Sequence, residues 1–334
     1  MNKYQKTENP HLSTKSVGLV GLGLMGTSIA TNLLLSDYSV KAIAPIPSDF
    51  ETARTQIEKQ LFHSESLGLL NKPVAEYLKE IKISYDYSEL KDCFLVMECV
   101  IEDFDIKVDI YNKIEACVDE HAIIGTNTSA IPISSLQEHL KYPDRFVGIH
   151  WAEPAYATRF LEIICGEKTD LEKANFLFNT AKSWGKEPTL LRKDIRGFIT
   201  NRLMYAVYRE GLALEQDKKA SIEDLDKCFR YDVGSWISLM GIFQRMDYIG
   251  IDHFSKMLDK NLPNLSNCEE IPPIMAELLE VKARGIYSQK GLYEYTAEEA
   301  KHWEESFAEF NNEMYHLANK YPYEFKSKND NHGK

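Results

Sequence analysis

The chain has 334 residues, roughly twice the length of a typical domain, so two domains are expected. Its composition, 44% hydrophobic and 27% charged residues, is that of a globular protein and excludes a mostly disordered chain. The 39 basic and 51 acidic residues give a net charge of −12, which argues against nucleic acid and anionic membranes as partners.

Cysteine usage and the absence of apolar leaders predict the compartment. The segment Met1–Ser16 is polar and lacks the apolar core of a signal peptide, and no run approaches the roughly 18 apolar residues of a membrane span. We therefore expect a cytoplasmic protein. The cysteines form no CxxC pair and are expected to be buried free thiols in a reducing compartment; they are Cys93, Cys99, Cys117, Cys165, Cys228 and Cys268.

Short apolar strands alternate with helical segments in the first part of the chain, which is the pattern of a parallel sheet with crossover helices. Strands are predicted at 15–21, 39–44, 82–85, 94–100 and 122–126, and helices at 23–35, 50–70 and 105–118. Three further strands are predicted at 145–151, 160–165 and 188–192.

The pattern changes after Asp194, where strand signals stop and helical periodicity runs almost to the end of the chain. We therefore predict an α/β domain with a doubly wound sheet over residues 1–193 and an all-α domain over residues 194–334. The histidines His63, His121, His139 and His253 have no ligand spacing, so no metal site is expected.

A GxGxxG motif follows the first predicted strand and opens the first helix. The first glycine permits a tight turn, the second lets a pyrophosphate approach the backbone, and the third lets the helix pack on the strand. Free N–H groups at the helix N-terminus then face the phosphates. This context predicts a Rossmann-type domain in which a dinucleotide is bound by Gly21, Gly23, Leu24, Met25 and Gly26.

The end of the second strand does not select between NAD and NADP. An acidic residue is usual there, because it bonds the adenosine ribose, but Ala44 occupies the position and no Arg or Lys directly follows it. Ser48 could reach a ribose or a phosphate, although the role of N-cap for the next helix is favoured.

His150 and Glu162 are the candidate catalytic pair. Strands 145–151 and 160–165 can pair as a hairpin centred near Tyr156, which places Glu162 opposite His150. Glu162 lies in an apolar strand, where a carboxylate needs a partner. A carboxylate bonded to an imidazole orients the ring and stabilises its charged form, so the pair can take a hydroxyl proton while hydride leaves.

From about Ser16 to Tyr295 the sequence resembles the 3-hydroxyacyl-CoA dehydrogenase family, in particular its 3-hydroxybutyryl-CoA type. The motifs that carry the resemblance occur in order and at family spacing. They are Gly21–Gly26, Glu98–Glu102 with Lys107, Asn127–Ser129, His150–Pro154 with Leu161 and Glu162, Gly197–Arg202, Asp247–Asp252 and Lys290–Tyr295.

The resemblance implies roles for single residues. His150 is the expected general base and Glu162 its partner, while Ser129 bonds the reacting oxygen of the substrate and Asn201 reaches into the cleft. The cofactor site is expected to include Glu102, Lys107 and Asn127. The resemblance also implies NAD as cofactor, a place in fatty acid metabolism, and a homodimer formed through a helical second domain that also serves substrate binding.

Three positions depart from the family pattern. Besides Ala44, Glu153 stands where the family has asparagine, and Ile242 stands in a turn that normally carries proline. An asparagine amide can donate to a substrate oxygen, whereas an ionised carboxylate cannot.

Three functions follow. The first is hydride transfer between a nicotinamide dinucleotide, NAD with NADP left open, and a 3-hydroxyacyl-CoA or 3-ketoacyl-CoA. The second keeps this chemistry on a substrate without CoA, such as a cationic, carnitine-like 3-hydroxy acid held by Trp151 and Glu153. The third is a dinucleotide-binding relative without activity. The lysine-dependent 6-phosphogluconate and 3-hydroxyisobutyrate dehydrogenases, which have a similar opening, are set aside because residues 197–215 contain no lysine.

Overall fold

The structure is a computed structural model that describes residues 15–321; the polar segment 1–14 and the segment 322–334 lie outside the described residues. The chain forms two compact units, the first ending at Thr200 and the second beginning at Asn201. This division falls after the predicted boundary at 193/194, because Phe198 is fully buried among apolar side chains of the first unit.

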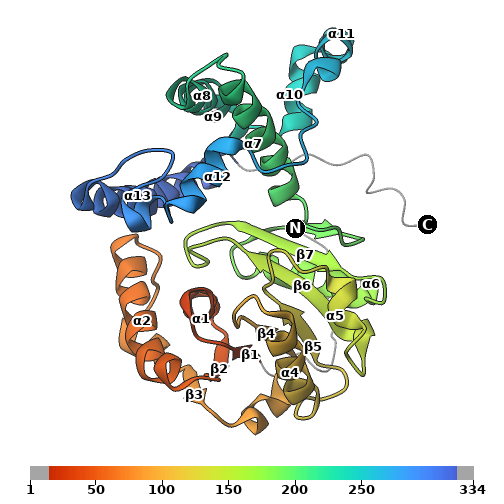
Figure 1. Cartoon of the computed structure of the whole chain (residues 1–334). Coiled ribbons are helices and arrows are strands. Elements are labelled where there is room, and N and C mark those ends of the chain that lie inside the picture. Colours follow the sequence, from red (N-terminus) through yellow and green to blue (C-terminus); the bar gives the residue numbers. More distant parts are fainter. Residues whose placement is uncertain (1–14, 322–334) are drawn as a thin grey trace. The chain divides into compact units, whose positions relative to one another are not determined.

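One eight-stranded sheet forms the centre of the first unit, with the order β3-β2-β1-β4-β5-β6-β7-β8 (Figure 1). All neighbours are parallel except β6 and β7, which are antiparallel. The eight predicted strands are confirmed. They are β1 (Ser16–Val20), β2 (Ser39–Ile43), β3 (Ile81–Ser84), β4 (Leu95–Glu98), β5 (Ile123–Thr126), β6 (Phe146–Trp151), β7 (Phe160–Cys165) and β8 (Glu187–Leu191).

Helices cover both faces of this sheet, which explains why its strands are nearly continuous apolar runs. Buried side chains of α1, α2 and α6 pack on one face, and those of α4 and α5 on the other. The helices are α1 (Leu24–Leu35), α2 (Pro47–Ser66), α3 (Val74–Tyr77), α4 (Phe104–Glu115), α5 (Ile133–Gln137) and α6 (Leu171–Lys182), with 3-10 turns η2 (Tyr87–Asp92) and η3 (Pro143–Arg145).

Two details of the helix predictions need correction. Helix α6 has an N-cap, Asp170, and buries Ala174 and Leu177, yet it was not predicted. Ser48 is not an N-cap, because α2 already begins at Pro47 after Ile46. A proline at the first helical position explains this earlier start, since its fixed φ is compatible with the helix and its missing N–H is not needed there.

The second unit is helical, as predicted, and the described residues 201–321 include no strand of the sheet. The connection between the units is α7 (Thr200–Gln216). The helices that follow are α8 (Ile222–Cys228), the π-helix η4 (Phe229–Val233), α9 (Gly234–Ile237), α10 (Ile242–Ile249), α11 (Ile251–Asn261), η5 (Leu262–Asn264), α12 (Pro273–Glu280), η6 (Ile286–Ser288) and α13 (Ala297–Lys320).

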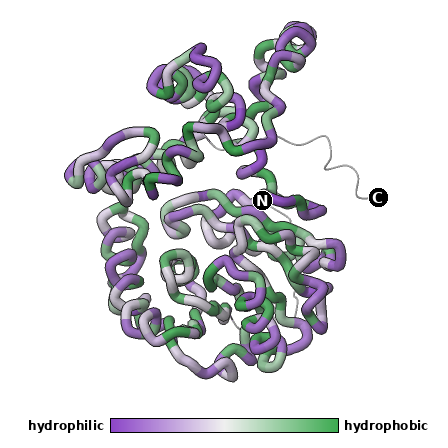
Figure 2. Tube along the Cα trace, viewed as in Figure 1, coloured by the Kyte–Doolittle hydropathy of each residue, from purple (hydrophilic) through white to green (hydrophobic). Residues whose placement is uncertain are grey.

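Burial differs sharply between the two units. Apolar colour is concentrated along the strands of the first unit, whereas apolar and polar residues alternate along the helices of the second (Figure 2). None of the described residues of the second unit is classed as buried. The prediction of buried cysteines is therefore wrong for Cys228 and Cys268, which are exposed, although Cys93 and Cys165 are buried.

No helix in the described part of the chain has the length and apolar character needed to cross a bilayer.

Candidate active site

The predicted pairing of β6 with β7 is confirmed, and His150 lies directly opposite Glu162 in the ladder. The Nδ1 atom of His150 is 2.7 Å from Oε2 of Glu162. The histidine side chain is 14% exposed and the glutamate side chain 1%. Because a carboxylate only accepts, Nδ1 carries the hydrogen of this bond. Nε2 is therefore the ring nitrogen available to exchange a proton with a substrate.

Two backbone groups hold the other carboxylate oxygen of Glu162. The N–H groups of Ile199 and Thr200 donate to Oε1 at 3.0 Å and 3.2 Å. Three donors thus compensate the burial of this carboxylate, which would otherwise be costly. The rings of Phe160 and Phe198 lie 5.9 Å and 5.7 Å from the His150 ring and limit its movement.

The glycine loop has the conformation that a dinucleotide site requires. Gly21 has φ +96°, which favours glycine, and a Cβ on Gly26 would lie 1.9 Å from the Gly21 carbonyl oxygen. A Cβ on Gly23, in contrast, would meet no protein atom within 4 Å. The space beside Gly23 is therefore open for a ligand, and the residues present fit a pyrophosphate.

The N-terminus of α1 supports the same conclusion. Its N-cap, Gly23, has no side chain to accept from the first N–H groups, and the first turn contains no acidic residue. The unpaired N–H groups and the helix dipole favour an anion at this end. Leu24, in the first turn, is 63% exposed, and Met25 is half-buried.

At the end of β2, Ala44 is fully buried, and its side chain can neither accept from a ribose nor pair with a phosphate. The exposed Ile46 and the stacked rings of Phe50 and Tyr85, whose centroids are 4.4 Å apart, lie in the segments after β2 and β3. The ends of β2 and β3 therefore present an apolar surface, where an acidic residue that bonds the ribose is usual.

A buried charge network that sequence reasoning missed lies at the end of β4. Glu98 is fully buried and accepts from Lys107 at 2.8 Å, Tyr111 at 2.7 Å and Thr126 at 2.8 Å. The Lys107 ammonium, 1% exposed, also lies 3.2 Å from Glu102. Lys107, predicted as a cofactor residue, thus has two carboxylate partners within the protein. An acid inside an apolar strand was the signal that could have identified Glu98.

Glu102 connects this network to the loop that follows β5. Its Oε1 accepts from the Thr128 hydroxyl and from the N–H groups of Ser129 at 3.1 Å and Ala130 at 3.2 Å. Burial raises the pKa of Glu102, but the Thr128 hydroxyl and the Lys107 ammonium outweigh it, so the net pKa is lowered. Glu102 therefore fixes the backbone of Ser129, the residue predicted to bond the substrate oxygen.

The other predicted residues divide between the two units. Asn127 accepts from the N–H of Trp151 at 3.0 Å through Oδ1, so it joins the ends of β5 and β6. Asn201 is the first residue of the second unit, and its role stays a prediction. Among the side chains that the structure describes, no group of three or more could hold a metal ion.

The loop after β6 gives different outcomes for Trp151 and Glu153. Trp151 is only 3% exposed, because its ring stacks on Trp184 at 5.6 Å and lies 5.2 Å from the Lys186 ammonium. It is a core residue, so the expected aromatic face for a substrate cation is wrong. Glu153 is an exposed residue and forms no ion pair with the described residues. The protein removes part of the water around its carboxyl, which raises the pKa of that group.

A dinucleotide-binding loop in the same unit as a carboxylate-held imidazole defines an oxidoreductase of the nicotinamide-dependent class. Residues 16–195 match the sequence model "3-hydroxyacyl-CoA dehydrogenase, NAD binding domain", and residues 197–295 match the C-terminal domain of the same enzymes. The chain belongs to the 3-hydroxyacyl-CoA dehydrogenase family, and NAD is the cofactor of its first domain.

Relatives within this family act on different substrates. The chain is 30% identical over 288 residues, 86% of its length and 93% of the relative, to 5-formyl-3-hydroxy-2-methylpyridine 4-carboxylate 5-dehydrogenase of Mesorhizobium japonicum. A solved structure of such a dehydrogenase, described as an NAD+-dependent dismutase, has a TM-score of 0.85 at 29% identity and covers 92% of this chain and 99% of its own.

Two further relatives extend this range. L-carnitine dehydrogenase of Oceanobacillus iheyensis is 31% identical over 239 residues, 71% of this chain and 76% of the relative. The structure of (S)-3-hydroxybutyryl-CoA dehydrogenase from Ralstonia eutropha has a TM-score of 0.71 at 26% identity, covering 85% of this chain and 100% of that one.

An added methyl group should have opposite effects at the second and third glycines of the loop, Gly23 and Gly26. Gly23→Ala should leave the melting temperature unchanged or slightly higher, because its φ of −67° suits alanine, but should weaken NADH binding at least about tenfold. Gly26→Ala should destabilise the fold by about 1–3 kcal/mol or more, because the methyl group meets backbone. Thermal melting with and without NADH measures both effects. Unchanged NADH affinity in Gly23→Ala would contradict the placement of the pyrophosphate.

Proposed function

We propose that this protein is an NAD-dependent dehydrogenase that interconverts a 3-hydroxyacyl-CoA and the corresponding 3-ketoacyl-CoA, a reaction of fatty acid metabolism, in the cytoplasm. The observation that carries the proposal is the 2.7 Å contact between His150 and Glu162 in the unit that holds the glycine loop. The family match over residues 16–295 supports the substrate class.

His150 is the proton-transfer group of the proposed mechanism. Nε2 accepts the hydroxyl proton as the C–H hydrogen leaves as hydride, and it returns the proton in the reductive direction. Glu162 keeps the hydrogen on Nδ1 and stabilises the imidazolium that forms. Ser129, held by Glu102, donates a hydrogen bond to the substrate oxygen and positions it near Nε2.

Bound NAD supplies the acceptor for the hydride. The N-terminal end of α1, with Gly21, Gly23 and Gly26, would hold its pyrophosphate. The strand order reverses between β1 and β4, which is where such sheets bind their ligands. Glu102 and Asn127 follow β4 and β5, the two strands on one side of this point.

Replacing the base tests the mechanism. His150→Gln should lower kcat by about 10²- to 10⁴-fold with acetoacetyl-CoA and NADH, because proton transfer is lost. NADH should still raise the melting temperature of this variant as in the wild type, since the glycine loop is unchanged. His121→Gln, at an exposed histidine before β5, is a control that should keep normal turnover. Turnover of His150→Gln at the wild-type rate would contradict the assignment.

A second candidate substrate is a 3-hydroxy acid without CoA that carries a cation. The exposed carboxylate of Glu153, three residues from the base and without an ion pair among the described residues, favours it. The similarity to an L-carnitine dehydrogenase is consistent with this choice. Because Trp151 is buried, the prediction of a cationic substrate depends on Glu153 alone.

A Glu153→Asn variant distinguishes the two substrates. If Glu153 binds a cation, the variant should lose at least about tenfold in kcat/KM with L-carnitine while its turnover of acetoacetyl-CoA is kept or improved. Glu172→Asn, in the first turn of α6, controls for the change in net charge. Equal effects on both substrates, or none on either, would dismiss a cationic substrate.

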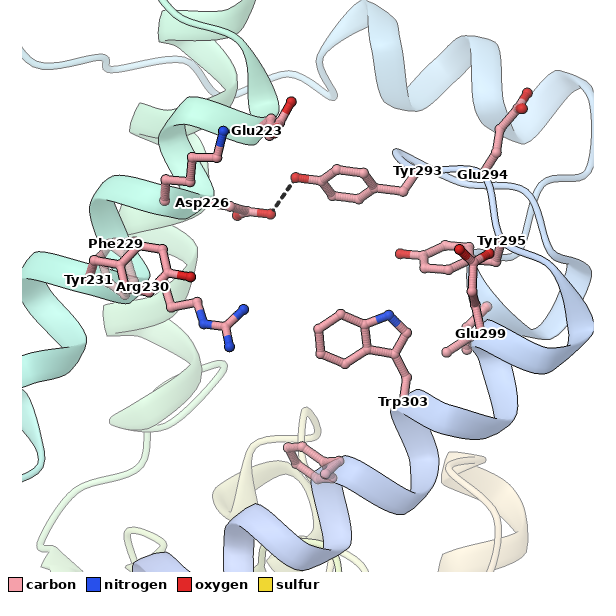
Figure 3. A pocket seen from close by; sticks show the side chains of 13 residues that line it. Glu223, Asp226, Phe229, Arg230, Tyr231, Tyr293, Glu294, Tyr295, Glu299 and Trp303 are labelled. Carbon is pink, nitrogen blue, oxygen red and sulfur yellow. Dashed lines mark hydrogen bonds and ion pairs between the residues drawn. The ribbon is translucent and has the colours of Figure 1, made fainter.

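We further propose that the second unit forms a homodimer. Without buried side chains among its described residues, this unit lacks the core that usually stabilises a domain. Its exposed apolar residues include Phe243 at 73% and Tyr248 at 74%, both on α10. The same unit also has an open cavity of about 910 Å³, whose lining includes Arg230, Tyr293, Tyr295 and Trp303 (Figure 3). A second copy covering these faces would supply the missing burial.

The molar mass tests the dimer. Light scattering should give about twice 38.4 kDa for the wild type, and Phe243→Asp combined with Tyr248→Asp should shift the protein towards the monomer, because two charges enter the apolar surface. Asn261→Asp combined with Asn264→Asp adds the same two charges at exposed polar positions and should remain dimeric. A monomeric wild type would contradict the proposal.

A further inference from the structure

Lys186 is buried in the first unit and has no carboxylate partner among the side chains that the structure describes. It is 3% exposed and lies just before β8. Its Nζ donates to the carbonyl oxygens of Ala155 and Thr158, and its ammonium lies 5.2 Å from the centroid of the Trp151 ring. A buried lysine usually forms an ion pair, so its use on two backbone carbonyls of one loop requires an explanation.

The loop in question, residues 152–159, connects the strand of His150 to the strand of Glu162. It carries Glu153 and contains a tight turn, in which the N–H groups of Ala157 and Thr158 both donate to the Pro154 carbonyl at 3.1 Å. Those bonds lie within the loop, so they shape the turn but do not fix its position on the sheet.

Lys186, α1 and α2 fix this position, and in α2 the Nδ1 atom of His63 lies 2.8 Å from the Tyr156 hydroxyl. The N–H of Ala155 donates to the Ser28 hydroxyl at 2.7 Å, which joins the loop to the helix whose N-terminus forms the predicted pyrophosphate site. Asn32 of the same helix donates to the Trp184 carbonyl at 3.3 Å, two residues before Lys186. The loop is thus held between α1 and the segment that leads into β8.

We propose that Lys186 is a positioning residue that holds the loop 152–159 on the sheet and thereby sets the place of Glu153 relative to the His150 imidazole. The inference rests on the proposed roles of His150 and Glu153. Burial, together with the like charge of Arg159, lowers the pKa of Lys186 to about 7. The neutral amine still has two N–H donors, so both carbonyl bonds can persist in either protonation state.

Hydrogen exchange measures how readily the amides of the loop open to solvent, and it needs no substrate. In Lys186→Met the carbonyls of Ala155 and Thr158 lose their donor, so the amides of the peptide 152–160 should exchange at least about tenfold faster, while those of β1 keep the wild-type rate. Lys182→Met, an exposed lysine in the last turn of α6, is the matched control and should leave both segments unchanged. An unchanged exchange rate for the peptide 152–160 would overturn the proposal.

A double-mutant cycle then tests the connection to Glu153. With L-carnitine as substrate, Lys186→Met should lower kcat/KM by roughly 10- to 100-fold in the wild-type background, because displaced groups at a reacting centre are costly. In the Glu153→Gln background the same change should cost much less, since the group to be positioned is already altered. If the two substitutions lower kcat/KM by independent factors that multiply in the double variant, Lys186 does not position Glu153. Lys186→Gln, which keeps N–H donors, replaces the methionine variant if that one does not fold.

The two kinds of failure can be told apart. Loss of the proposed function would appear as normal turnover in His150→Gln, whatever the exchange rate of the loop. Failure of the inference about Lys186 would appear as an unchanged exchange rate or an additive cycle, even where His150→Gln is inactive.

Discussion

The carboxylate of Glu162 is the constraint on which the site depends. An unpaired carboxylate buried in a protein costs several kcal/mol, so the fold has to bring donors to it. Those three donors come from two places in the sequence: His150 on the neighbouring strand and the backbone of Ile199 and Thr200. The antiparallel pair β6 and β7 and the segment before α7 must therefore meet at one point. The orientation of the imidazole follows from the same requirement, because the ring supplies the third donor.

Glu98 is a second buried acid whose charge has to be compensated, and its partners connect it to the loop that follows β5. Glu98 is compensated by Lys107, Tyr111 and Thr126, and the Lys107 ammonium is shared with Glu102. Since Glu102 in turn accepts from the Thr128 hydroxyl and from the backbone N–H groups of Ser129 and Ala130, the position of the Ser129 main chain is fixed by a charge inside the core. Networks of this kind are rigid when every member is satisfied, which is the property that a site with precise proton transfer requires.

The sequence predicted those features that depend on short-range pattern. The eight strands could be recognised because buried parallel strands are apolar runs, and the pairing of His150 with Glu162 followed from the symmetry of a hairpin about Tyr156. The burial of Trp151 could not be recognised, because Trp184 and Lys186, which cover it, are distant in sequence. The exposure of the cysteines in the helical unit was also missed, because helical periodicity shows that a face is apolar but not whether the same chain covers it.

In the proposed function, the reaction depends on the buried Glu162 of the first unit, whereas the choice of substrate depends on the exposed Glu153. Removing the Glu162 carboxylate would leave two partly buried backbone N–H groups without this acceptor, so the proposed mechanism couples stability and catalysis at this position. Glu153 is different, because its carboxylate is exposed and forms no ion pair with the described residues. A substitution there changes the charge offered to a substrate with little loss of folding free energy. Under the proposed function, the proton-transfer pair is held by the core, and the choice between an acyl thioester and a charged hydroxy acid depends on the loop that carries residue 153.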